Sequence, residues 1–439
     1  MQINYWDRDI ETAEREKIES YQIARVRSLL DRVISSNAFY RRKLGDAGLS
    51  GGTDIHSLDD FAQVPFLKKD ELVADQANNP PFGTNLTFPL ESYIKYHQTS
   101  GTTGRPYRCL DSEEDWRWWV RCWGFVHTGV GITARDRLYF AFSFGPFVGF
   151  WGAWEGARAV GALAIPGGGM GSLQRLTTIM DTQANTLVCT PSYALRLAEE
   201  ARENGIDPAS TSIVRVLNSG EPGASIPATK KRIESTWGAK CYDHHGMTEV
   251  GAMSFECVLQ PGGIHLIEAE YSFEVLDPAT NKPADEGELV VTNLGRIGMP
   301  VIRYRTGDKV RITRERCECG RTFARLEGGI IGRVDQMMIV RGINVFPSSV
   351  EAIVRQFDAV EEFFVEVFRR REMDEMEVKI EVSQGEPETV ASALSTELQK
   401  RLAFRPIVTV VPRNTLPRFE LKAKRFVDKR NLTGRTGEA

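Results

Sequence analysis

Apolar residues follow a helical period near the start of the chain. Between residues 11 and 38, apolar side chains including Ile18, Val26 and Val33 recur on one side of a 3.6-residue repeat. This stripe predicts a long amphipathic helix that packs on the main body of the protein. The residues that follow, to about residue 95, include Asn79-Pro80-Pro81 and predict a loop-rich stretch.

From about residue 137, short apolar runs alternate with helical patterns. Repeated strand–helix–strand units with buried strands predict an α/β fold with a doubly wound, mostly parallel sheet. The expected strands are 137–143, 162–166, 186–189, 213–217 and 239–242, and the expected helices are 151–160, 174–183, 192–204 and 224–236. Such sheets bind ligands past the carboxyl ends of their strands, where Asn218–Glu221 and Asp243–Glu249 are expected.

The pattern changes again after about residue 252. Phe273–Leu276 and Gly287–Val291 alternate between apolar and polar residues, which predicts a β-rich subdomain over about 252–333. A compact module follows, with helices at 347–357 and 386–402, strands at 362–368, 376–383 and 407–411, and a charged hairpin tip at 369–375. We therefore expect an N-terminal domain over 1–333 and a small, mobile α+β domain over 334–439.

Composition excludes several classes of protein. A chain of 439 residues with 41% hydrophobic and 26% charged residues is typical of a globular protein with two or three domains. The net charge of −4 gives no basic surface for nucleic acid. Gly145, Pro146, Glu155 and Arg158 interrupt the most apolar region, so no membrane span is expected. The charged first residues do not resemble a signal peptide, and seven cysteines, an odd number, favour a reducing, cytoplasmic location.

The run TSGTTGRP, from Thr99 to Pro106, is the strongest candidate for chemistry. Its glycines allow a tight turn, and its hydroxyls and backbone N–H groups are the donors that a triphosphate needs. It lacks the Gly-Lys-Ser/Thr ending of the Walker A motif. A flexible linker is the alternative interpretation.

A second candidate is a metal site. Cys317-Glu318-Cys319 precedes a glycine, and Cys257 and His265 flank a turn upstream. Three thiolates and one imidazole make a closed tetrahedral zinc site, which would tie the β-rich subdomain together. The alternative is that these four residues are unrelated.

Several motifs occur in the order typical of one enzyme superfamily. They are Thr99–Pro106, Asn218–Pro222, Asp243–Glu249, Tyr304–Asp308, Gly332–Asp335 with Arg341–Pro347, and Leu416–Arg418 ahead of Lys422–Arg425. Together they resemble the adenylate-forming enzymes, which include acyl-CoA synthetases and luciferases. CTPSYAL at 189–195 and VRGINVFPSSVE at 340–351 look like the branch of phenylacetate–CoA ligases and other aryl-CoA ligases.

The resemblance implies an ATP-dependent aryl acid–CoA ligase. Such an enzyme joins an aromatic acid to AMP with release of pyrophosphate, then transfers the acyl group to CoA. Thr248 would contact the α-phosphate, Glu249 would hold Mg²⁺, and Asp308 with Arg333 would hold the ribose. The remaining contacts implied are Ser100, Gly101, Thr102, Thr103 and Gly104 for the phosphates, Glu221, Pro222, Asp243 and His244 for the adenine, and Ser219, Gly220 and His245 as further cofactor-binding residues, with His245 stacking on the adenine or facing the acyl group.

Lys422 matches the mobile catalytic lysine of the superfamily, with Lys424 as the competing candidate. The family pattern has glycine where Leu421 stands, so the backbone of this loop is expected to differ. The resemblance also implies that the C-terminal domain rotates about Asp335 after adenylation. Gly342 would then line the path of the CoA thiol, because a side chain there would block it.

Aromatic residues between Phe140 and Trp151 suggest an acyl pocket for a flat ring. By resemblance, Phe142 and Phe147 would face the acid together with Ser219 and Gly220, and the acid would be of the phenylacetate, benzoate or anthranilate type. Core packing is the alternative explanation for these aromatics.

Other functions stay open at this point. The adenylate could pass to the phosphopantetheine of a carrier protein or to another nucleophile, or a deazaflavin could be the group adenylated. His245, where the family usually has tyrosine, and Leu421 are the support for a catalytically lapsed, zinc-containing binding protein. The sequence leaves a homodimer open as well.

Overall fold

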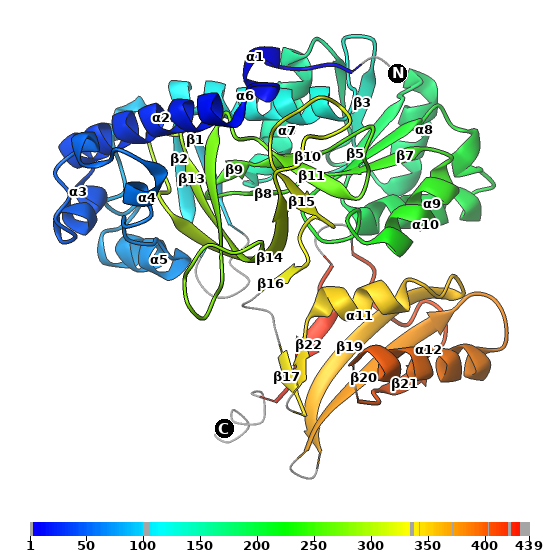
Figure 1. Cartoon of the computed structure of the whole chain (residues 1–439). Coiled ribbons are helices and arrows are strands. Elements are labelled where there is room, and N and C mark those ends of the chain that lie inside the picture. The colour runs from blue at the N-terminus through cyan, green and yellow to red at the C-terminus, as the bar shows by residue number, and fades with distance from the viewer. Residues whose placement is uncertain are drawn as a thin grey trace.

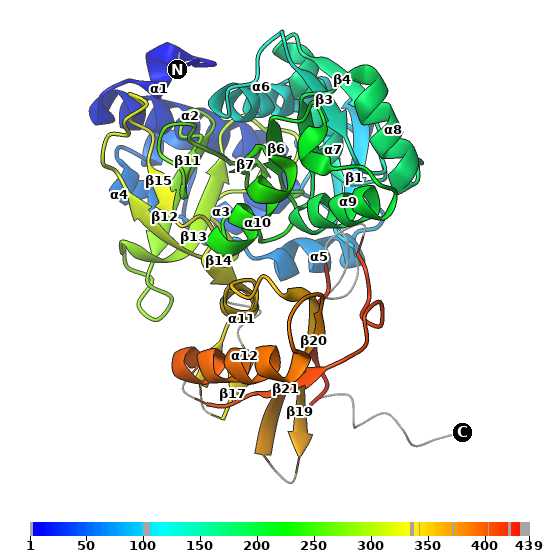
Figure 2. The same cartoon turned by 90° about the vertical axis from the view of Figure 1, so that its right-hand side faces the viewer.

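The chain forms a large N-terminal body and a smaller C-terminal domain, which lie one above the other in Figures 1 and 2. The structure, a computed structural model, describes residues 3–99, 106–333, 338–341, 343–370, 373–402, 404–419 and 423–430. Among the helices of these residues, none is long and apolar enough to cross a membrane.

A five-stranded parallel sheet forms the centre of the N-terminal body. Its strands, in spatial order, are β4 (Leu163–Pro166), β3 (Arg137–Phe140), β5 (Thr186–Cys189), β6 (Arg215–Asn218) and β7 (Lys240–Asp243). The chain runs from β3 to β4 on one side and returns to β5 on the other. The strand order therefore reverses between β3 and β5, where doubly wound sheets bind their ligands. The α/β fold class expected from the sequence is confirmed.

Helices cover both faces of this sheet. Leu138 and Phe140 of β3 pack in the core with α6 (Glu113–Gly129) and α7 (Val148–Ala159). Tyr139 points the other way, into a second core, because successive side chains of a strand alternate. That face carries α8 (Ser172–Thr182), α9 (Pro191–Glu203), η3 (Pro208–Ser210) and α10 (Pro227–Trp237). Helix α6 was not predicted, because its second half is buried on all sides and lacks a polar stripe.

A seven-stranded antiparallel sheet lies beside the parallel one, in the region where the β-rich subdomain was expected. Its path is β10 (Ser254–Glu256), β11 (Gly263–Leu266), β15 (Arg325–Glu327), β14 (Tyr304–Thr313), β13 (Glu286–Asn293) and β12 (Tyr271–Leu276), with β16 (Gly332–Arg333) also paired to β14. The short β8 (Gly246–Met247) and β9 (Gly251–Ala252) connect the two sheets. Burial alternates along β14, so Asp308 faces inward.

In Figure 1, α1 and α2 lie along the top of the body, and the other N-terminal helices lie below α2 on its left side. The long helix expected over 11–38 is α2, which spans Arg15–Ser36, because Asn37 ends it and caps the next helix by accepting from the backbone of Tyr40. The stretch expected to be loop-rich contains short helices that are too short to show a period. The short helices of the N-terminal region are α1 (Arg8–Glu11), α3 (Ala38–Gly45), η1 (Gly52–Asp54), α4 (Leu58–Phe61), α5 (Lys69–Asn78) and η2 (Leu90–Ser92).

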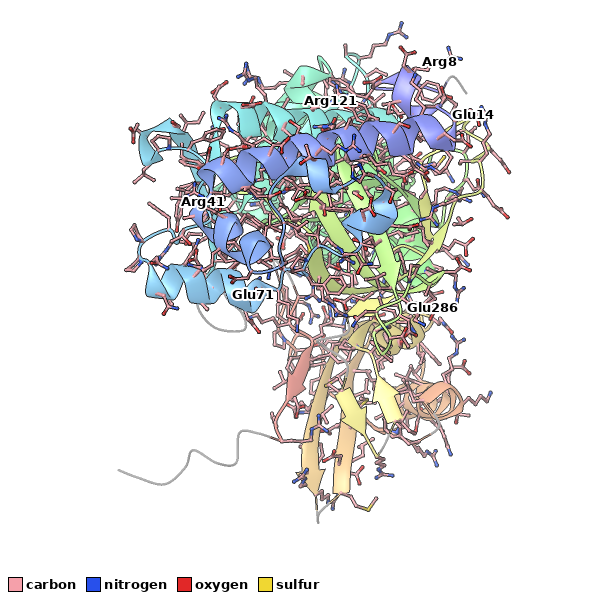
Figure 3. The ribbon with its side chains drawn as sticks, turned by 60° about the vertical axis from the view of Figure 1, so that its left-hand side comes forward. Arg8, Glu14, Arg41, Glu71, Arg121 and Glu286 are labelled. Carbon is pink, nitrogen blue, oxygen red and sulfur yellow. The ribbon has the colours of Figure 1, made fainter. Side chains whose placement is uncertain are left out.

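Ion pairs fasten this layer to the rest of the body. Arg121, labelled in Figure 3, lies on α6 and donates to Glu270 at 2.6 Å and to Asp7 at 2.8 Å. Arg25 of α2 also reaches Glu270, at 3.0 Å. One buried carboxylate thus joins α2, α6 and the turn before β12.

The C-terminal domain has a core of its own. Its sheet has the order β21 (Ile407–Val410), β20 (Met373–Val382), β19 (Val360–Arg370) and β22 (Phe426–Asp428), covered by α11 (Pro347–Val354) and α12 (Pro387–Leu402). A hairpin of β17 (Met338–Val340) and β18 (Ile343–Val345) precedes it. β19 and β20 pair antiparallel as far as Arg370 and Met373, as the charged hairpin tip predicts. The expected boundary at 333/334 comes directly before residues outside the description and stays a prediction.

Candidate functional site

The two ends of the predicted phosphate loop are held together. β1 (Tyr93–Gln98) and β2 (Arg108–Ser112) pair antiparallel, with Gln98 opposite Arg108. Beyond them, Thr99 and Tyr107 bond twice, through the Thr99 N–H to the Tyr107 carbonyl and the Tyr107 N–H to the Thr99 hydroxyl, both at 3.0 Å. Residues 100–105 therefore connect two anchored positions that lie side by side, although they are themselves outside the described residues.

Thr248 and Glu249 occupy the turn between β8 and β9. The Glu249 side chain is buried, and its Oε1 accepts a hydrogen bond from the Tyr304 hydroxyl at 3.0 Å. Lys69 Nζ, at the start of α5, lies 3.1 Å from the same oxygen. The carboxylate is an oxygen ligand of the kind Mg²⁺ prefers, and the ammonium places positive charge beside it.

This turn is fixed from below by Arg296. Its guanidinium donates to the carbonyls of Thr248 at 3.2 Å and Glu249 at 3.0 Å, and to Asp111 Oδ1 at 2.7 Å. Asp111 lies on β2, in the hairpin that carries the phosphate loop. Burial acts to raise the pKa of Asp111, but Arg296 and His97 hold it below its usual value.

Asp308, His245 and Arg333 form a second polar group. His245 Nε2 lies 2.9 Å from Asp308 Oδ2, and Arg333 Nη1 lies 3.2 Å from Oδ1. Asp308 pairs with Arg333 across β14 and β16. Burial acts to raise the pKa of Asp308, but the charges of His245 and Arg333 and the hydrogen bond from His245 hold it low. The histidine at the position unusual for the family thus contacts the carboxylate expected to bind the ribose.

Asp243 and His244 are buried at the end of β7. His244 lies against Trp123, with ring centroids 4.4 Å apart, and its Nδ1 lies 2.6 Å from the Ser254 carbonyl oxygen. Burial lowers the pKa of His244 to about 3, so the ring is neutral. Burial, and then the charge of Glu256, raises the pKa of Asp243 to about 6.

The segment after β6 turns sharply. Gly220 has φ +95°, a conformation that favours glycine, and the Ser219 N–H donates to the Cys189 carbonyl at 3.3 Å. Glu221 directs its carboxylate to the N-terminus of α9 and to the C-terminal domain: Oε1 accepts from Ser192 N at 2.8 Å and Oε2 accepts from Ala423 N at 2.6 Å. Pro222 follows directly in the chain.

Phe142 and Phe147 follow β3, at the edge where the strand order reverses. Phe142 is buried and stacks on Phe150 with centroids 3.6 Å apart. Phe147 is half-buried and precedes α7. The ring of Phe142 thus belongs to an aromatic cluster, which leaves both the acyl-pocket and the core-packing interpretations standing.

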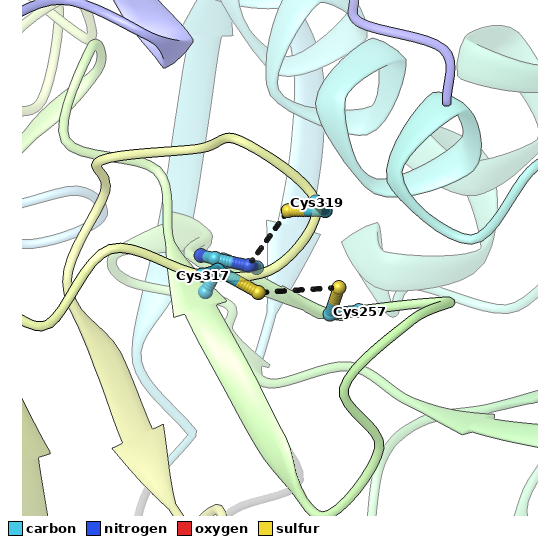
Figure 4. A group of neighbouring side chains, drawn as sticks. Cys257, Cys317 and Cys319 are labelled. Carbon is cyan, nitrogen blue, oxygen red and sulfur yellow. Dashed lines mark hydrogen bonds between the residues drawn. The ribbon is translucent and has the colours of Figure 1, made fainter. Parts of the chain in front are cut away.

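The expected metal ligands come together. Ligand atoms of Cys257, His265, Cys317 and Cys319 all lie within 4.8 Å of one another, and all four residues are buried. Cys257 Sγ lies 3.6 Å from Cys317 Sγ, and Cys319 Sγ lies 3.6 Å from His265 Nε2, as the dashed lines in Figure 4 mark.

A second layer of bonds surrounds this cluster. His265 Nδ1 lies 3.2 Å from the Phe323 carbonyl, which leaves Nε2 for the cluster. The Tyr5 hydroxyl donates to the Cys319 carbonyl, and Arg321 donates to Glu11 and, at 2.6 Å, to the Asn4 carbonyl. The loop of Cys317 and Cys319 is therefore fastened to the N-terminal segment.

Several predicted site residues cannot be placed. They lie outside the described residues: Ser100, Gly101, Thr102, Thr103, Gly104, Asp335, Gly342 and Lys422.

Sequence reasoning missed residues that the structure brings to the site. Lys69 stands in the charged run Lys68–Glu71, which has no feature beyond that of a helix start. Arg296 belongs to none of the motifs, and Ser192 stands in the motif at 189–195, which does not predict its contacts. Tyr304 opens the motif ending in Asp308, so its inward-facing position, four residues earlier on β14, could have been inferred from strand alternation.

Comparisons with known proteins find relatives over most of the chain. The family model of the AMP-binding enzyme C-terminal domain matches residues 342–430. The chain is 35% identical over 382 residues to the phenylacetate–coenzyme A ligase of Thermus thermophilus, covering 86% of this chain and 84% of that one.

Solved structures of one ligase resemble the whole chain. A 2-hydroxyisobutyryl-CoA ligase in the postadenylation state, in complex with R3-HIB-AMP, is 32% identical, with a TM-score of 0.92 over 98% of this chain and 93% of that one. The same ligase with 2-HIB-AMP and CoA, in the thioesterification state, is 33% identical over the same shares and gives 0.74.

The raised pKa of Asp243 predicts a pH-dependent stability. The folded protein binds this proton more tightly than the unfolded chain, whose aspartate pKa is about 3.9. Its stabilising contribution is complete below pH of about 4 and disappears as the pH rises through about 6. Asp243→Asn should therefore reduce the fall in unfolding free energy between pH 5 and pH 8 by about 1 kcal/mol, measured by urea denaturation.

The exposed Asp181→Asn on α8 makes the same chemical change and serves as the control. If wild type and Asp243→Asn lose stability in parallel over this range, the raised pKa is wrong.

Proposed function

The chain belongs to the phenylacetate–coenzyme A ligase family of AMP-forming acid–thiol ligases, and on this premise we propose that it activates an aromatic carboxylic acid with ATP and transfers the acyl group to CoA. The observation that carries the proposal is the convergence of two polar groups. Glu249 contacts Tyr304 of β14, and Asp308 belongs to the same strand. Arg296 joins the Glu249 turn to Asp111 of the hairpin that carries the predicted phosphate loop. The group around Glu249 suits a metal-bound polyphosphate, and the group around Asp308 suits a ribose.

Electrostatics explain why these residue types occur together. Joining a carboxylate to the α-phosphate of ATP brings two anions together, so the barrier falls where fixed donors and cations surround the developing charge. Lys69 supplies a cation 3.1 Å from Glu249, and Thr248 supplies a hydroxyl on the same turn. Glu249 would hold Mg²⁺, which when bound offsets phosphate charge.

Activation makes the second step feasible. A carboxylate does not expel hydroxide to form a thioester, whereas the mixed anhydride with AMP has an electrophilic carbonyl and a good leaving group. The thiol of CoA then attacks that carbonyl and AMP leaves. Asp308, with Arg333 and His245 beside it, would accept the ribose hydroxyls and keep the adenylate in register.

The aromatic acid rests on two supports. The curated relative is a phenylacetate–coenzyme A ligase, and aromatic rings gather at the end of β3 where the strand order reverses. The solved relative at TM-score 0.92 holds a hydroxyacyl adenylate instead, so the choice of acid needs a direct test.

We also propose that the cysteine cluster holds structural zinc. Tetrahedral Zn–S bonds of about 2.3 Å place two ligand sulfurs about 3.8 Å apart. The observed 3.6 Å between Cys257 and Cys317 fits that geometry, as does the neutral-donor role left to His265 Nε2. All four positions are taken by the protein, so the site would stabilise the fold and not take part in catalysis.

Lys422 is proposed as the catalytic lysine, Asp335 as the hinge and Gly342 as the residue lining the thiol path. These three roles, and the domain division at 333/334, are inferred from the family motifs. Their test lies in the separate half-reactions.

The first prediction of this proposed function concerns the reaction. With ATP and Mg²⁺, the protein should release pyrophosphate when given phenylacetate, benzoate or anthranilate, and should form a CoA thioester when CoA is added. Both products can be measured, by a coupled assay and by mass spectrometry, with 2-hydroxyisobutyrate as the non-aromatic comparison. Turnover of 2-hydroxyisobutyrate alone would contradict the proposal that the substrate is an aromatic acid. Absence of pyrophosphate release with every acid would contradict the proposed ligase activity.

The second prediction concerns the lysine. Lys422→Ala should slow adenylation by about a hundredfold or more, because the cation between carboxylate and α-phosphate is lost. Thioester formation from supplied acyl-adenylate should remain close to that of the wild type. Lys424→Ala is the matched control and should leave adenylation within a few-fold. The reverse ranking of the two variants would transfer the role to Lys424.

The third prediction concerns the metal. The purified protein should contain zinc, and Cys317→Ser should lose it and melt several degrees lower, because metal binding free energy is folding free energy. Glu318→Gln, in the same turn but exposed, should keep both the zinc and the melting temperature. Equal melting of metal-free and metal-loaded wild type would contradict a structural role.

A further inference from the structure

The two domains meet next to the candidate site through Glu221. This residue follows β6 in the N-terminal body, and its carboxylate accepts two backbone hydrogen bonds. One comes from Ser192 of α9 at 2.8 Å, and the other from Ala423 of the C-terminal domain at 2.6 Å. Each oxygen of the Glu221 carboxylate thus accepts a hydrogen bond from one backbone N–H group, and the two N–H groups belong to different domains.

Arg425 makes a second link two residues later. Its Nη1 donates to the Ser192 hydroxyl at 3.0 Å, across the domain boundary. The same guanidinium also donates to the Glu362 carboxylate of β19, through Nε at 2.7 Å and Nη2 at 3.0 Å. Arg425 is only 5% exposed, so the interdomain bond forms away from solvent.

Charge complementarity favours these contacts. Ser192 lies in the first turn of α9, where free N–H groups and the helix dipole stabilise an anion such as Glu221. Burial acts to lower the pKa of Arg425, but Glu362, Glu351 and Glu221 raise it, so the guanidinium stays charged. An arginine from one domain is thus stabilised by carboxylates from both.

These hydrogen bonds lie next to the proposed catalytic lysine in the sequence. Ala423 directly follows Lys422, so Glu221 binds the first peptide N–H after the proposed catalytic lysine. The whole chain also overlays better on the relative's postadenylation structure, with a TM-score of 0.92, than on its thioesterification structure, with a TM-score of 0.74.

We propose that Glu221, Ser192 and Arg425 form an interdomain clamp that holds the chain after Lys422 in place for adenylation and opens for thioester formation. Glu221 is then a positioning residue for the first half-reaction, and its carboxylate is engaged by the protein itself instead of by adenine. This inference rests on the proposed function, because it needs two half-reactions.

Three single variants test the clamp. Glu221→Gln keeps the shape but removes one acceptor, Arg425→Lys removes the fork that reaches Glu362 and Ser192 together, and Ser192→Ala removes only the hydroxyl. Glu203→Gln, exposed at the far end of α9, makes the same charge change as Glu221→Gln and serves as control. Single-turnover pyrophosphate release reports adenylation, and thioester formation from supplied acyl-adenylate reports the second step.

The clamp predicts losses confined to adenylation. Glu221→Gln should lower the rate constant of adenylation about tenfold, since a hydrogen bond to a charged carboxylate is stronger than one to a neutral amide, and the KM for ATP should change less than twofold. Ser192→Ala should lower it about threefold and leave thioester formation at the wild-type rate or faster, with an unchanged melting temperature. The double variant of Glu221 and Ser192 should lose less than the product of the single losses, because both act on one interface.

Other outcomes overturn the inference. A higher KM for ATP with an unchanged rate constant in Glu221→Gln would place that residue in the adenine slot. Equal losses in both half-reactions of Ser192→Ala, or variants that match wild type in both, would show that the contacts are packing only. If the wild-type protein neither releases pyrophosphate nor forms a thioester from acyl-adenylate, the proposed function itself is refuted. The variants test only the clamp.

Discussion

The buried ion pair of Arg296 and Asp111 is the constraint on which the site depends. Both side chains are almost completely removed from water, and a charge moved there costs several kcal/mol unless partners replace its hydration. Arg296 finds them in Asp111 and in the carbonyls of Thr248 and Glu249. Asp111 finds them in Arg296 and the Trp119 indole N–H, 3.2 Å away. The β1–β2 hairpin belongs to neither large sheet, so this pair fixes it against the turn that carries Glu249.

The site lies where elements of different origin end together. The parallel sheet supplies Asp243 and the Gly220 turn from its strand ends, the antiparallel sheet supplies Tyr304 and Asp308 from the inner face of β14, and α5 supplies Lys69 from its first turn. Each of these elements is held in place by its own packing in the hydrophobic core. The polar side chains at their junction are held by direct contacts with one another, such as those of Tyr304 and Lys69 with Glu249.

Local patterns predicted those parts of the molecule that depend on local physics. The strand at Thr186–Cys189 matches its apolar run residue for residue, because a strand buried on both faces needs an uninterrupted apolar sequence. The cysteine cluster could be anticipated because the Cys-x-Cys turn brings two of its thiols together by itself. The pairing of His245 with Asp308, 63 positions apart, could not, since it depends on how β14 sits beside the end of β7. The same holds for Lys69, which comes to Glu249 only through the packing of α5.

The fastening of the Cys319 loop to the N-terminal segment has a consequence for biosynthesis. Arg321 is 310 positions after Glu11 and 317 after Asn4. At about 5–20 residues per second, a ribosome needs on the order of tens of seconds to make the intervening polypeptide. During that time Asn4 and Tyr5 are already outside the exit tunnel without Cys319 and Arg321, which bind them in the folded protein, so this part of a nascent chain stays accessible to chaperones until the β-rich subdomain is translated.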